Sequence, residues 1–367
     1  MKLPGLTDVH VHLRVPGGEH KEDFLTGTQA ALAGGFTRLL AMPNTKPPLV
    51  TLKDWKIARN LATNQSLCDV FLYAGGSSEH LDELAGLGQV AAAIKLYLDQ
   101  TYGPLRLQGL ASLQRIFEQW PKDKPIVCHA EEESVAVVLG LASIYKRSVH
   151  ICHVSRQSEV ELIAKARAEG VQVTCEVTPH HLFLNENDAK RLGPYGDMRP
   201  VLQAQSDVDA LWRHLGTTID CVASDHAPHT IAEKGGRAEQ YGVLTKQQHL
   251  EPIPEQSVDN YPPGIPGLES TLPLLLTAAS QGRIPYDLIP KLLDENPRRI
   301  FGLPIQPETW IEIDQNASYD FPDHPLYTKC GWSPFVGMRM TGLLRRVVLR
   351  GKIVYQDGLV LAGSGSS

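Results

Sequence analysis

Eight short apolar runs, separated by segments of helical spacing, constrain the fold of this chain more than any other feature. The runs that we interpret as strands are residues 7–13, 36–42, 69–75, 91–98, 124–130, 148–154, 171–177 and 219–225. Residues 21–35 and 158–170, which lie between such runs, repeat apolar residues at helical spacing and end on glycine. Repeated strand and helix units place consecutive strands parallel to one another. The order therefore predicts an α/β fold, a TIM-type (β/α)8 barrel over residues 1–303.

The chain after residue 303 has a different pattern. Residues 304–362 contain apolar stretches that predict a hairpin, so we expect a small C-terminal β-structured extension that packs on the barrel. Residues 363–367 are glycine and serine and are typical of a linker or tag. The first predicted strand starts almost at residue 1, with no strand before it, which suggests a domain taken from a longer polypeptide.

Composition excludes several classes of function. The 367 residues carry a formal net charge of −6 and no long lysine or arginine block, so neither nucleic acid nor an anionic membrane is expected as a partner. No apolar run is long enough to span a bilayer, and residues 1–8 lack the hydrophobic stretch of a signal peptide. The six cysteines are scattered, which suits a reduced compartment. We therefore expect a cytoplasmic protein that acts on a small molecule.

Two histidines stand two residues apart in the first predicted strand. Side chains alternate faces along a strand, so His10 and His12 point the same way, and Arg14 follows two residues later. Burying two imidazoles without partners costs free energy. They could be core histidines bonded to the backbone, or they could be two ligands of one metal ion, since imidazole is a common zinc ligand.

Further polar residues stand at the carboxyl ends of the later predicted strands. They are Asn44, Lys95, His129, His153, His180, Arg199 and Asp225. In a barrel of this type these ends meet at one face, where catalytic groups gather. Four histidines and an aspartate converging there predict a zinc or similar divalent ion with an open position for water.

Lys95 is unusual because it lies inside an apolar strand, in "AAAIKLYL". A buried lysine loses its proton or finds a partner. It could pair with Asp99 or another carboxylate. Alternatively, the neutral amine could add carbon dioxide and become a carbamate, an anion able to bridge two cations.

The motifs "DVHVHLR", "AMPNTKPP", "IKLYL", "CHAE", "HICHVS", "CEVTPHHL", "MRP" and "SDHAPH" closely resemble those of dihydroorotases in the amidohydrolase superfamily. The similarity is strongest to the dihydroorotase domain of the multifunctional eukaryotic pyrimidine-synthesis protein, and it runs from about Leu3 to the final hairpin. The resemblance implies two zinc ions bridged by carboxylated Lys95. One zinc would be held by His10, His12 and Asp225, and the second by His129 and His153.

The resemblance also implies the reaction, a reversible cyclisation of N-carbamoyl-L-aspartate to L-dihydroorotate. In the hydrolytic direction hydroxide attacks the ring carbonyl, and Asp225 carries the proton to the leaving nitrogen. The residues implied in binding are Arg14, Asn44 and His229 for the substrate carboxylate, and Arg199, Pro263 and Gly264 for the ring. Each of these could instead be an ordinary surface or turn residue.

A loop after Lys95 corresponds to the segment that closes over the substrate in this family. Thr101 and Tyr102 would be its tip, where Thr101 offers a hydroxyl and Tyr102 excludes water. Cys152 and Glu176 could bind an additional zinc or could support the ligands from behind. A homodimer, and other domains on the same polypeptide, are expected from the resemblance alone.

Two departures from the family pattern keep other functions open. Val15 stands where the family has an acidic residue, and residues 231–261 form a polar insertion that we expect to be flexible. The chain could therefore be an inactive dihydroorotase-like domain that serves as a structural or dimerising module. It could also be another cyclic amidohydrolase, although a buried arginine would penalise a substrate without a carboxylate.

Overall fold

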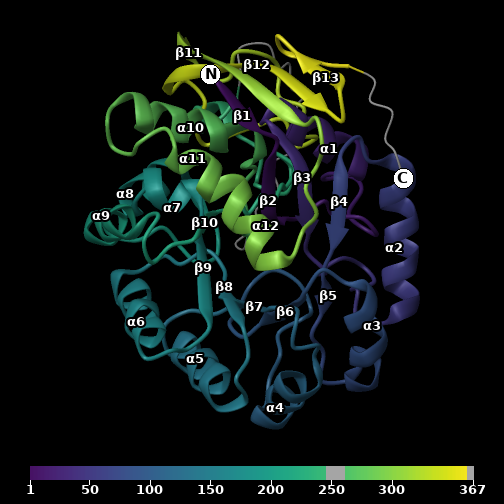
Figure 1. Ribbon diagram of the computed structural model, residues 1–367. Helices are drawn as coiled ribbons and strands as arrows, with labels where there is room; N and C mark the ends of the chain where they lie inside the picture. The colour runs from purple at the N-terminus through teal and green to yellow at the C-terminus, as the bar shows by residue number, and fades with distance from the viewer. Residues whose placement is uncertain (245–260, 362–367) are drawn as a thin grey trace.

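The computed structural model describes residues 1–244 and 261–361. Part of the predicted insertion and the predicted tail, 363–367, lie outside the described residues. Within the described ranges parallel strands alternate with helices along most of the chain, and a separate antiparallel sheet follows (Figure 1). The expected α/β class is therefore confirmed.

The parallel strands form two sheets. They are β2 (Leu6–Val11), β3 (Phe36–Ala41) and β4 (Asp69–Leu72) in the first, and β5 (Ala74–Gly75), β6 (Ile94–Tyr97), β7 (Ile126–His129), β8 (Val149–Ile151), β9 (Val173–Val177) and β10 (Cys221–Val222) in the second. Each of the predicted runs overlaps one of these strands, except the third, which contains both β4 and β5; β2 starts one residue before its predicted run. All residues of β2 and β3 are buried, as expected for parallel strands that are covered on both faces.

One backbone pairing connects the two sheets at an edge, and a side-chain hydrogen bond ties the link between β4 and β5 to the first sheet. Tyr73 separates β4 from β5, and its buried hydroxyl donates a hydrogen bond of 2.8 Å to the carbonyl of Val9 in β2. On the other side Val11 pairs in parallel with His226, which follows β10. These contacts bring the carboxyl ends of both sheets to one region of the molecule.

Helices cover the outside of the parallel strands (Figure 1). The α-helices are α1 (Phe24–Ala33), α2 (Leu52–Gln65), α3 (Leu84–Val90), α4 (Leu110–Gln119), α5 (Glu133–Tyr145), α6 (Gln157–Ala168), α7 (Pro179–Phe183), α8 (Glu186–Leu192), α9 (Gln205–His214), α10 (Leu268–Ser280), α11 (Leu288–Pro290) and α12 (Asn296–Phe301). Local signals explain several starts: α1 begins after Asp23, whose side chain caps the amide of Thr26, and Thr51 caps α2 in the same way. Shorter helical turns are η1 (Leu81–Glu83), η2 (Gly193–Gly196), η3 (Ala238–Tyr241) and the π-helical η4 (Lys291–Glu295).

The C-terminal extension is an antiparallel sheet, as expected. Its strands are β11 (Trp310–Asp320), β12 (Arg339–Leu349), β13 (Lys352–Gln356) and β14 (Leu359–Val360). The sequence prediction missed one strand: β1 (Lys2–Pro4) precedes β2 and pairs with β11. Three residues give too short a pattern to be recognised, and their pairing depends on a strand about 310 residues away.

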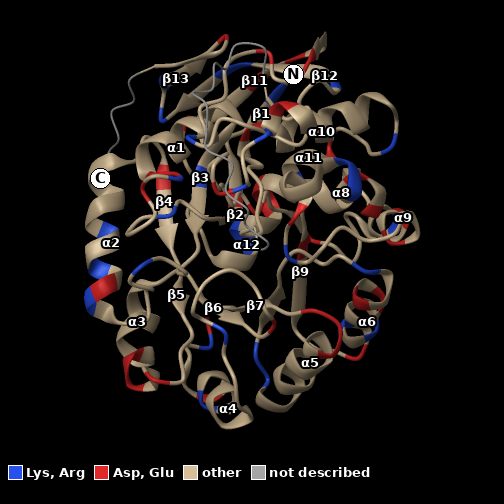
Figure 2. Ribbon diagram, turned by 180° about the vertical axis from the view of Figure 1, so that it is seen from behind, with Lys and Arg blue, Asp and Glu red and all other residues tan. Residues whose placement is uncertain are grey.

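The charges of the described residues are dispersed. Figure 2 shows acidic and basic residues interspersed on the outer helices instead of gathered in a basic face. The full sequence carries a formal net charge of −6. Among residues 1–244 and 261–361 no helix has the length and apolar character needed to cross a membrane.

In the described part of the predicted insertion, residues 231–244, several side chains are buried. Ile231, Ala238 and Val243 are buried in one hydrophobic cluster with Trp332 of the C-terminal region. Lys234, in the same stretch, is fully buried. The polar composition of the whole segment concealed these few inward-facing residues, because they have no helical or strand period.

We predict that Tyr73→Phe destabilises the fold without changing its shape. The substitution removes a buried hydroxyl and leaves the carbonyl of Val9 without this donor, which costs about 1–3 kcal/mol. Urea unfolding of the variant and of a control, Tyr145→Phe in α5, measures the difference. Equal stability of the Tyr73 variant and the parent would contradict a structural role for this contact.

Candidate active site

Two histidines and one aspartate meet where β2 and β10 end. The Nε2 atoms of His10 and His12 lie 3.3 and 3.1 Å from the same oxygen, Oδ1 of Asp225. His10 is the penultimate residue of β2, and Asp225 follows β10 by three residues. His12 lies just beyond the end of β2, yet its ring still reaches the same point as His10. Their ligand atoms are close enough to hold one metal ion.

The far side of each imidazole is held by an oxygen. The Nδ1–H of His10 donates to Glu176 in β9 over 2.5 Å, and the Nδ1–H of His12 donates to Oδ1 of Asn44 over 2.8 Å. Asn44 is oriented in turn, because its amide nitrogen donates to the carbonyl of Tyr102. A histidine whose Nδ1 is held in this way presents the lone pair of Nε2 outward.

This arrangement leaves acceptors facing one another. With its proton on Nδ1, neutral His12 directs a lone pair at the carboxylate oxygen of Asp225 over 3.1 Å, where no proton separates them. A cation between these atoms would remove the repulsion. The donor set of imidazole nitrogen and carboxylate oxygen is the one that zinc and similar ions take. The residues present therefore fit a metal ion.

Burial sets the protonation states of these groups. It lowers the pKa of His12 to about 4, and burial together with His129 holds the pKa of His153 well below its usual range. Burial alone would raise the pKa of the Asp225 carboxyl, but His10 and His12 outweigh it and hold that pKa well below its usual range. At neutral pH His12 and His153 are neutral and Asp225 is ionised, which are the forms that bind metals.

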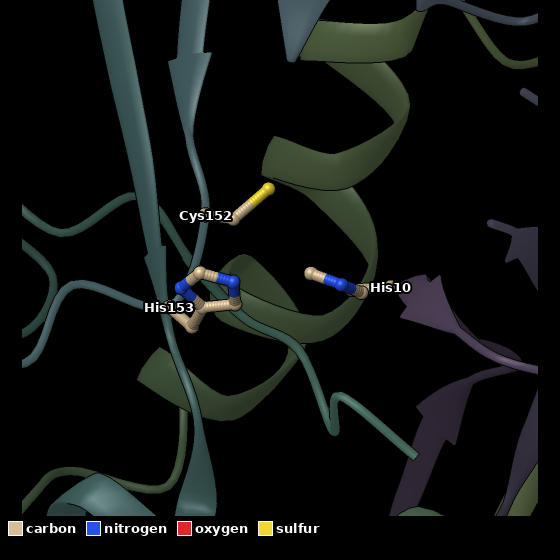
Figure 3. A group of neighbouring side chains, drawn as sticks. All are labelled: His10, Cys152 and His153. Carbon is tan, nitrogen blue, oxygen red and sulfur yellow. The ribbon is translucent and has the colours of Figure 1, made fainter. Parts of the chain in front are cut away.

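A second group lies beside the first. His129, at the end of β7, contacts His153 through a hydrogen bond of 2.9 Å between Nδ1 and Nε2. The Nδ1 atom of His153 is buried and has no hydrogen-bond partner among the described residues. Figure 3 shows His10 opposite Cys152 and His153, with the three side chains facing a common space, and their ligand atoms all lie within 4.8 Å of one another.

Lys95 of β6 is fully buried, as expected, but it does not pair with Asp99. Its Nζ atom lies 2.8 Å from Sγ of Cys152. The Asp99 carboxylate instead accepts from the amide of Glu131 and the hydroxyl of Ser134. The interpretation of Lys95 as the partner of Asp99 is therefore wrong. Within the described residues Lys95 makes no ion pair.

Arg14 lies at the mouth of this site, although not on the strand. It follows the end of β2 and has a φ of 62°, so the expected continuation of the strand face does not hold. Its guanidinium is buried, and Nε donates to the carbonyl of Pro228 over 3.2 Å. Nη2 lies 3.1 Å from Nε2 of His229, which is 3.1 Å from the carbonyl of Pro263.

Gly264 and Arg199 adjoin this group through Asp197. The amide of Gly264 donates to the carbonyl of Asp197, and Arg199 pairs with the Asp197 side chain. Gly264 has a φ of 134°, and a Cβ atom there would lie 2.5 Å from the carbonyl oxygen of Ala227. Only glycine therefore allows the backbone to approach so closely.

The side chain of Tyr102 lies against Arg14 and His229. Thr101 forms no side-chain hydrogen bond within residues 1–244 and 261–361. The Tyr102 ring lies edge-on to His229, with 5.0 Å between ring centroids, and 5.6 Å from the Arg14 guanidinium carbon. Two residues that the sequence interpretation did not single out, Lys21 and Glu233, also contact this group. Neither carries a recognisable motif, so only the tertiary structure reveals them.

Comparisons with known proteins agree with this arrangement. The family described as "Dihydro-orotase-like" matches residues 1–136. The chain is 47% identical over its whole length to the multifunctional protein CAD of Squalus acanthias, and it spans about 15% of that protein. It is also 32% identical to the dihydroorotase of Methanothermobacter thermautotrophicus, over 99% of this chain and 86% of the relative.

Two solved structures are similar over the whole chain. L-hydantoinase (dihydropyrimidinase) from Arthrobacter aurescens gives a TM-score of 0.88 at 25% identity, covering 100% of this chain and 87% of that one. The inactive dihydroorotase-like domain of a CAD-like multifunctional protein from Chaetomium thermophilum gives 0.80 at 25% identity, covering 99% and 96%.

We predict that the metal-free protein loses stability as the pH falls from 6.5 to about 4. Burial lowers the pKa of His12 and of His181 to about 4 from 6.5, so the unfolded chain binds more protons in this interval and acid favours it. Denaturant unfolding of chelator-treated protein across this range measures the slope. His181→Asn should reduce the slope, whereas His80→Asn should not. A flat profile would contradict the assignment.

Proposed function

The chain belongs to the dihydroorotase family, and on this basis we propose that it catalyses the reversible cyclisation of N-carbamoyl-L-aspartate to L-dihydroorotate. The reaction makes or breaks one amide bond in a six-membered ring, and the substrate carries a free carboxylate. The activity is named for relatives of this chain, and the chain spans only about 15% of the multifunctional relative from Squalus acanthias. For this chain the activity is therefore a proposal.

The observation that carries this proposal is the environment of Arg14. Its side chain is buried, and within residues 1–244 and 261–361 it forms no ion pair with a carboxylate. A buried guanidinium without an anion is costly, so the site favours a ligand that brings one. Dihydroorotate supplies this charge, whereas an uncharged dihydropyrimidine does not. This distinction favours dihydroorotase over hydantoinase activity, although a hydantoinase has a similar fold.

We propose two zinc ions as cofactors. His10, His12 and Asp225 would hold one ion, and His129 and His153 the second, with Lys95 as a bridging carbamate. When bound, such ions polarise a carbonyl oxygen and lower the pKa of water. The Nζ of Lys95 forms the carbamate by adding carbon dioxide and releasing a proton. Its burial without an ion pair in the described structure supports this chemistry.

The chain's own groups would divide the remaining tasks. Asp225 takes the proton of the attacking water and delivers it to the ring nitrogen that leaves. Arg14, Asn44 and His229 bind the substrate carboxylate, and for Asn44 this requires its amide to leave the carbonyl of Tyr102. By the family resemblance, Thr101 would lie on the loop that closes over the reacting centre. The residues assigned to the ring are Arg199, Pro263 and Gly264.

An additional zinc at Cys152 and Glu176 has less support. Both residues approach His10, since Glu176 bonds to its Nδ1 and Cys152 belongs to one candidate ligand group with it. However, burial raises the pKa of the Cys152 thiol well above its usual range, which favours the protonated thiol in the metal-free protein. We propose Glu176 as the group that orients His10.

The larger organisation is proposed by similarity. We propose that the two parallel sheets belong to one (β/α)8 barrel over residues 1–303, with 304–362 as the packed extension. The parallel pairing of Val11 with His226, which connects the two sheets at one edge, supports this arrangement. We also propose that the domain works beside other domains of one polypeptide, because its relatives include much larger multifunctional proteins. A homodimer and a cytoplasmic location are proposed from the family resemblance alone.

An inactive scaffold is the second candidate, and its supporting observation is the similarity to an inactive domain. Val15 and the segment 231–261, the two departures from the family pattern in the sequence, also suggest an inactive domain. Val15 is buried in the hydrophobic core, and Ile231, Ala238 and Val243 are buried in a second cluster. The described structure shows no disruption of the site at either place. The proposed metal ligands are all present, which favours activity.

We predict that the purified domain opens L-dihydroorotate when zinc and bicarbonate are supplied, with about two zinc ions bound per chain. Ultraviolet absorbance follows the reaction, and metal analysis of the same sample gives the zinc content. Dihydrouracil, which lacks the carboxylate, should react far more slowly. Zinc-loaded protein without turnover would support the scaffold, and faster reaction of dihydrouracil would support a hydantoinase.

We predict that Lys95→Ala and the longer Lys95→Met both abolish turnover and reduce bound zinc. Neither side chain can form a carbamate, and the charge that would lie between two cations is lost. Lys291→Met, at an exposed lysine that pairs with Asp287, is the control and should keep both properties. Full activity in either Lys95 variant would exclude a bridging carbamate.

A further inference from the structure

Lys21 is a buried cation at the edge of the proposed substrate site. It lies just before α1, and only 5% of its surface is exposed. Its Nζ atom is 2.8 Å from Oε1 of Glu233, 3.0 Å from the hydroxyl of Tyr102 and 3.1 Å from Nδ1 of His229. An ammonium group has three N–H donors and no acceptor, so these three partners use all of its donors.

The partners of His229 together indicate which of its nitrogens carries the proton. Lys21 can only donate, so its contact favours an accepting Nδ1 and a ring proton on Nε2. Nη2 of Arg14 can also only donate and lies 3.1 Å from Nε2, so the nearby acceptors decide between the two tautomers. The carbonyl of Pro263, 3.1 Å from Nε2, accepts that proton and supports the same tautomer. The other acceptor near Nδ1, Oε2 of Glu233, is 3.7 Å away, too far for a hydrogen bond.

His229 is neutral, so it has only one ring proton to place. Burial and the neighbouring Arg14 cation hold the pKa of His229 well below its usual range. With this proton on Nε2, His229 and Nη2 of Arg14 present two donors only 3.1 Å apart. The Nε2–H already donates to the carbonyl of Pro263, so a substrate carboxylate oxygen between the two donors would share this proton with Pro263 and accept from Arg14. The opposite tautomer would turn a lone pair toward the same anion.

Lys21 also fixes the loop residue Tyr102. The Tyr102 hydroxyl accepts from Lys21, and its carbonyl accepts from the side chain of Asn44. Its ring lies against His229, with Nζ of Lys21 4.7 Å from the ring centroid. The position of this side chain over the anion-facing donors therefore depends on the same ammonium group.

We infer that Lys21 is a positioning residue: it holds His229 as the Nε2–H tautomer for the substrate carboxylate and anchors the Tyr102 hydroxyl above it. The inference rests on the proposed function, because it concerns that substrate's carboxylate. Lys21 does not touch the reacting atoms in this assignment. It acts through His229 and Tyr102, and Glu233 is the counter-ion that makes its burial tolerable.

The tautomer can be read in the unmodified protein. We would label the histidines with ¹⁵N and identify the His229 signals by their loss in a His229→Gln variant. The expected result is a protonated Nε2 and an unprotonated Nδ1 at neutral pH. A proton on Nδ1 would overturn the inference, whether or not the protein turns over.

The second test is the affinity for L-dihydroorotate, measured calorimetrically on metal-free protein, so that it requires no catalysis. Lys21→Met keeps the length of the side chain but removes its donors, and it should weaken binding by about 10-fold to 100-fold, as expected for a lost charge-assisted hydrogen-bond network. Tyr102→Phe, which removes one hydroxyl, should have a smaller effect. Lys291→Met is the matched control and should bind as the parent does.

A double-mutant cycle separates positioning from a general loss of structure. In a His229→Ala background Lys21→Met should weaken binding much less than in the parent, because its main target is gone. With active protein, Lys21→Met should raise KM for dihydroorotate more than it lowers kcat. An unchanged dissociation constant in Lys21→Met, or equal effects in both backgrounds, would overturn the inference. Parent protein without turnover would reject only the proposed function.

Discussion

The site is organised around a single carboxylate oxygen that two imidazoles approach at once. His10 and His12 direct Nε2 at Oδ1 of Asp225, and burial keeps water from separating these groups. Behind them Glu176 and Asn44 fix the rings, so the histidines cannot rotate away. The fold thus holds close together several groups that repel one another or cannot form hydrogen bonds with one another. Such a cluster is stable only with a cation in it or with strong support from the surrounding fold.

The strand pattern explains why much of this site could be predicted from sequence. Period-two alternation put His10 and His12 together, and the rule for strand ends added His129, His153 and Asp225. The structure brings these residues to one place. The contacts of Arg14 and Lys95 differ from the sequence predictions. Those of Arg14 depend on the backbone conformation beyond the end of its strand. Arg14 reaches its partners through a left-handed residue conformation, and Lys95 contacts Cys152 instead of Asp99.

Other parts of the molecule had no local signal. β1 has three residues and is defined by its distant partner β11, so no short window could reveal it. Lys21 sits in an ordinary polar stretch before a helix, and its burial results from contacts with residues about 80 and 210 positions away. Tertiary contacts of this kind override what composition suggests. The same holds for the residues of 231–244 that pack against Trp332.

Gly264 sets a condition on how the chain length near the site can vary. Its backbone touches Ala227 so closely that no side chain fits, and its amide is bound to Asp197. Any change in chain length before residue 261 must therefore still deliver a glycine to this position. A longer connection is inexpensive in general, since each doubling of a flexible loop costs only about 0.6 kcal/mol. A change of length is thus easier to accommodate than a side chain at Gly264.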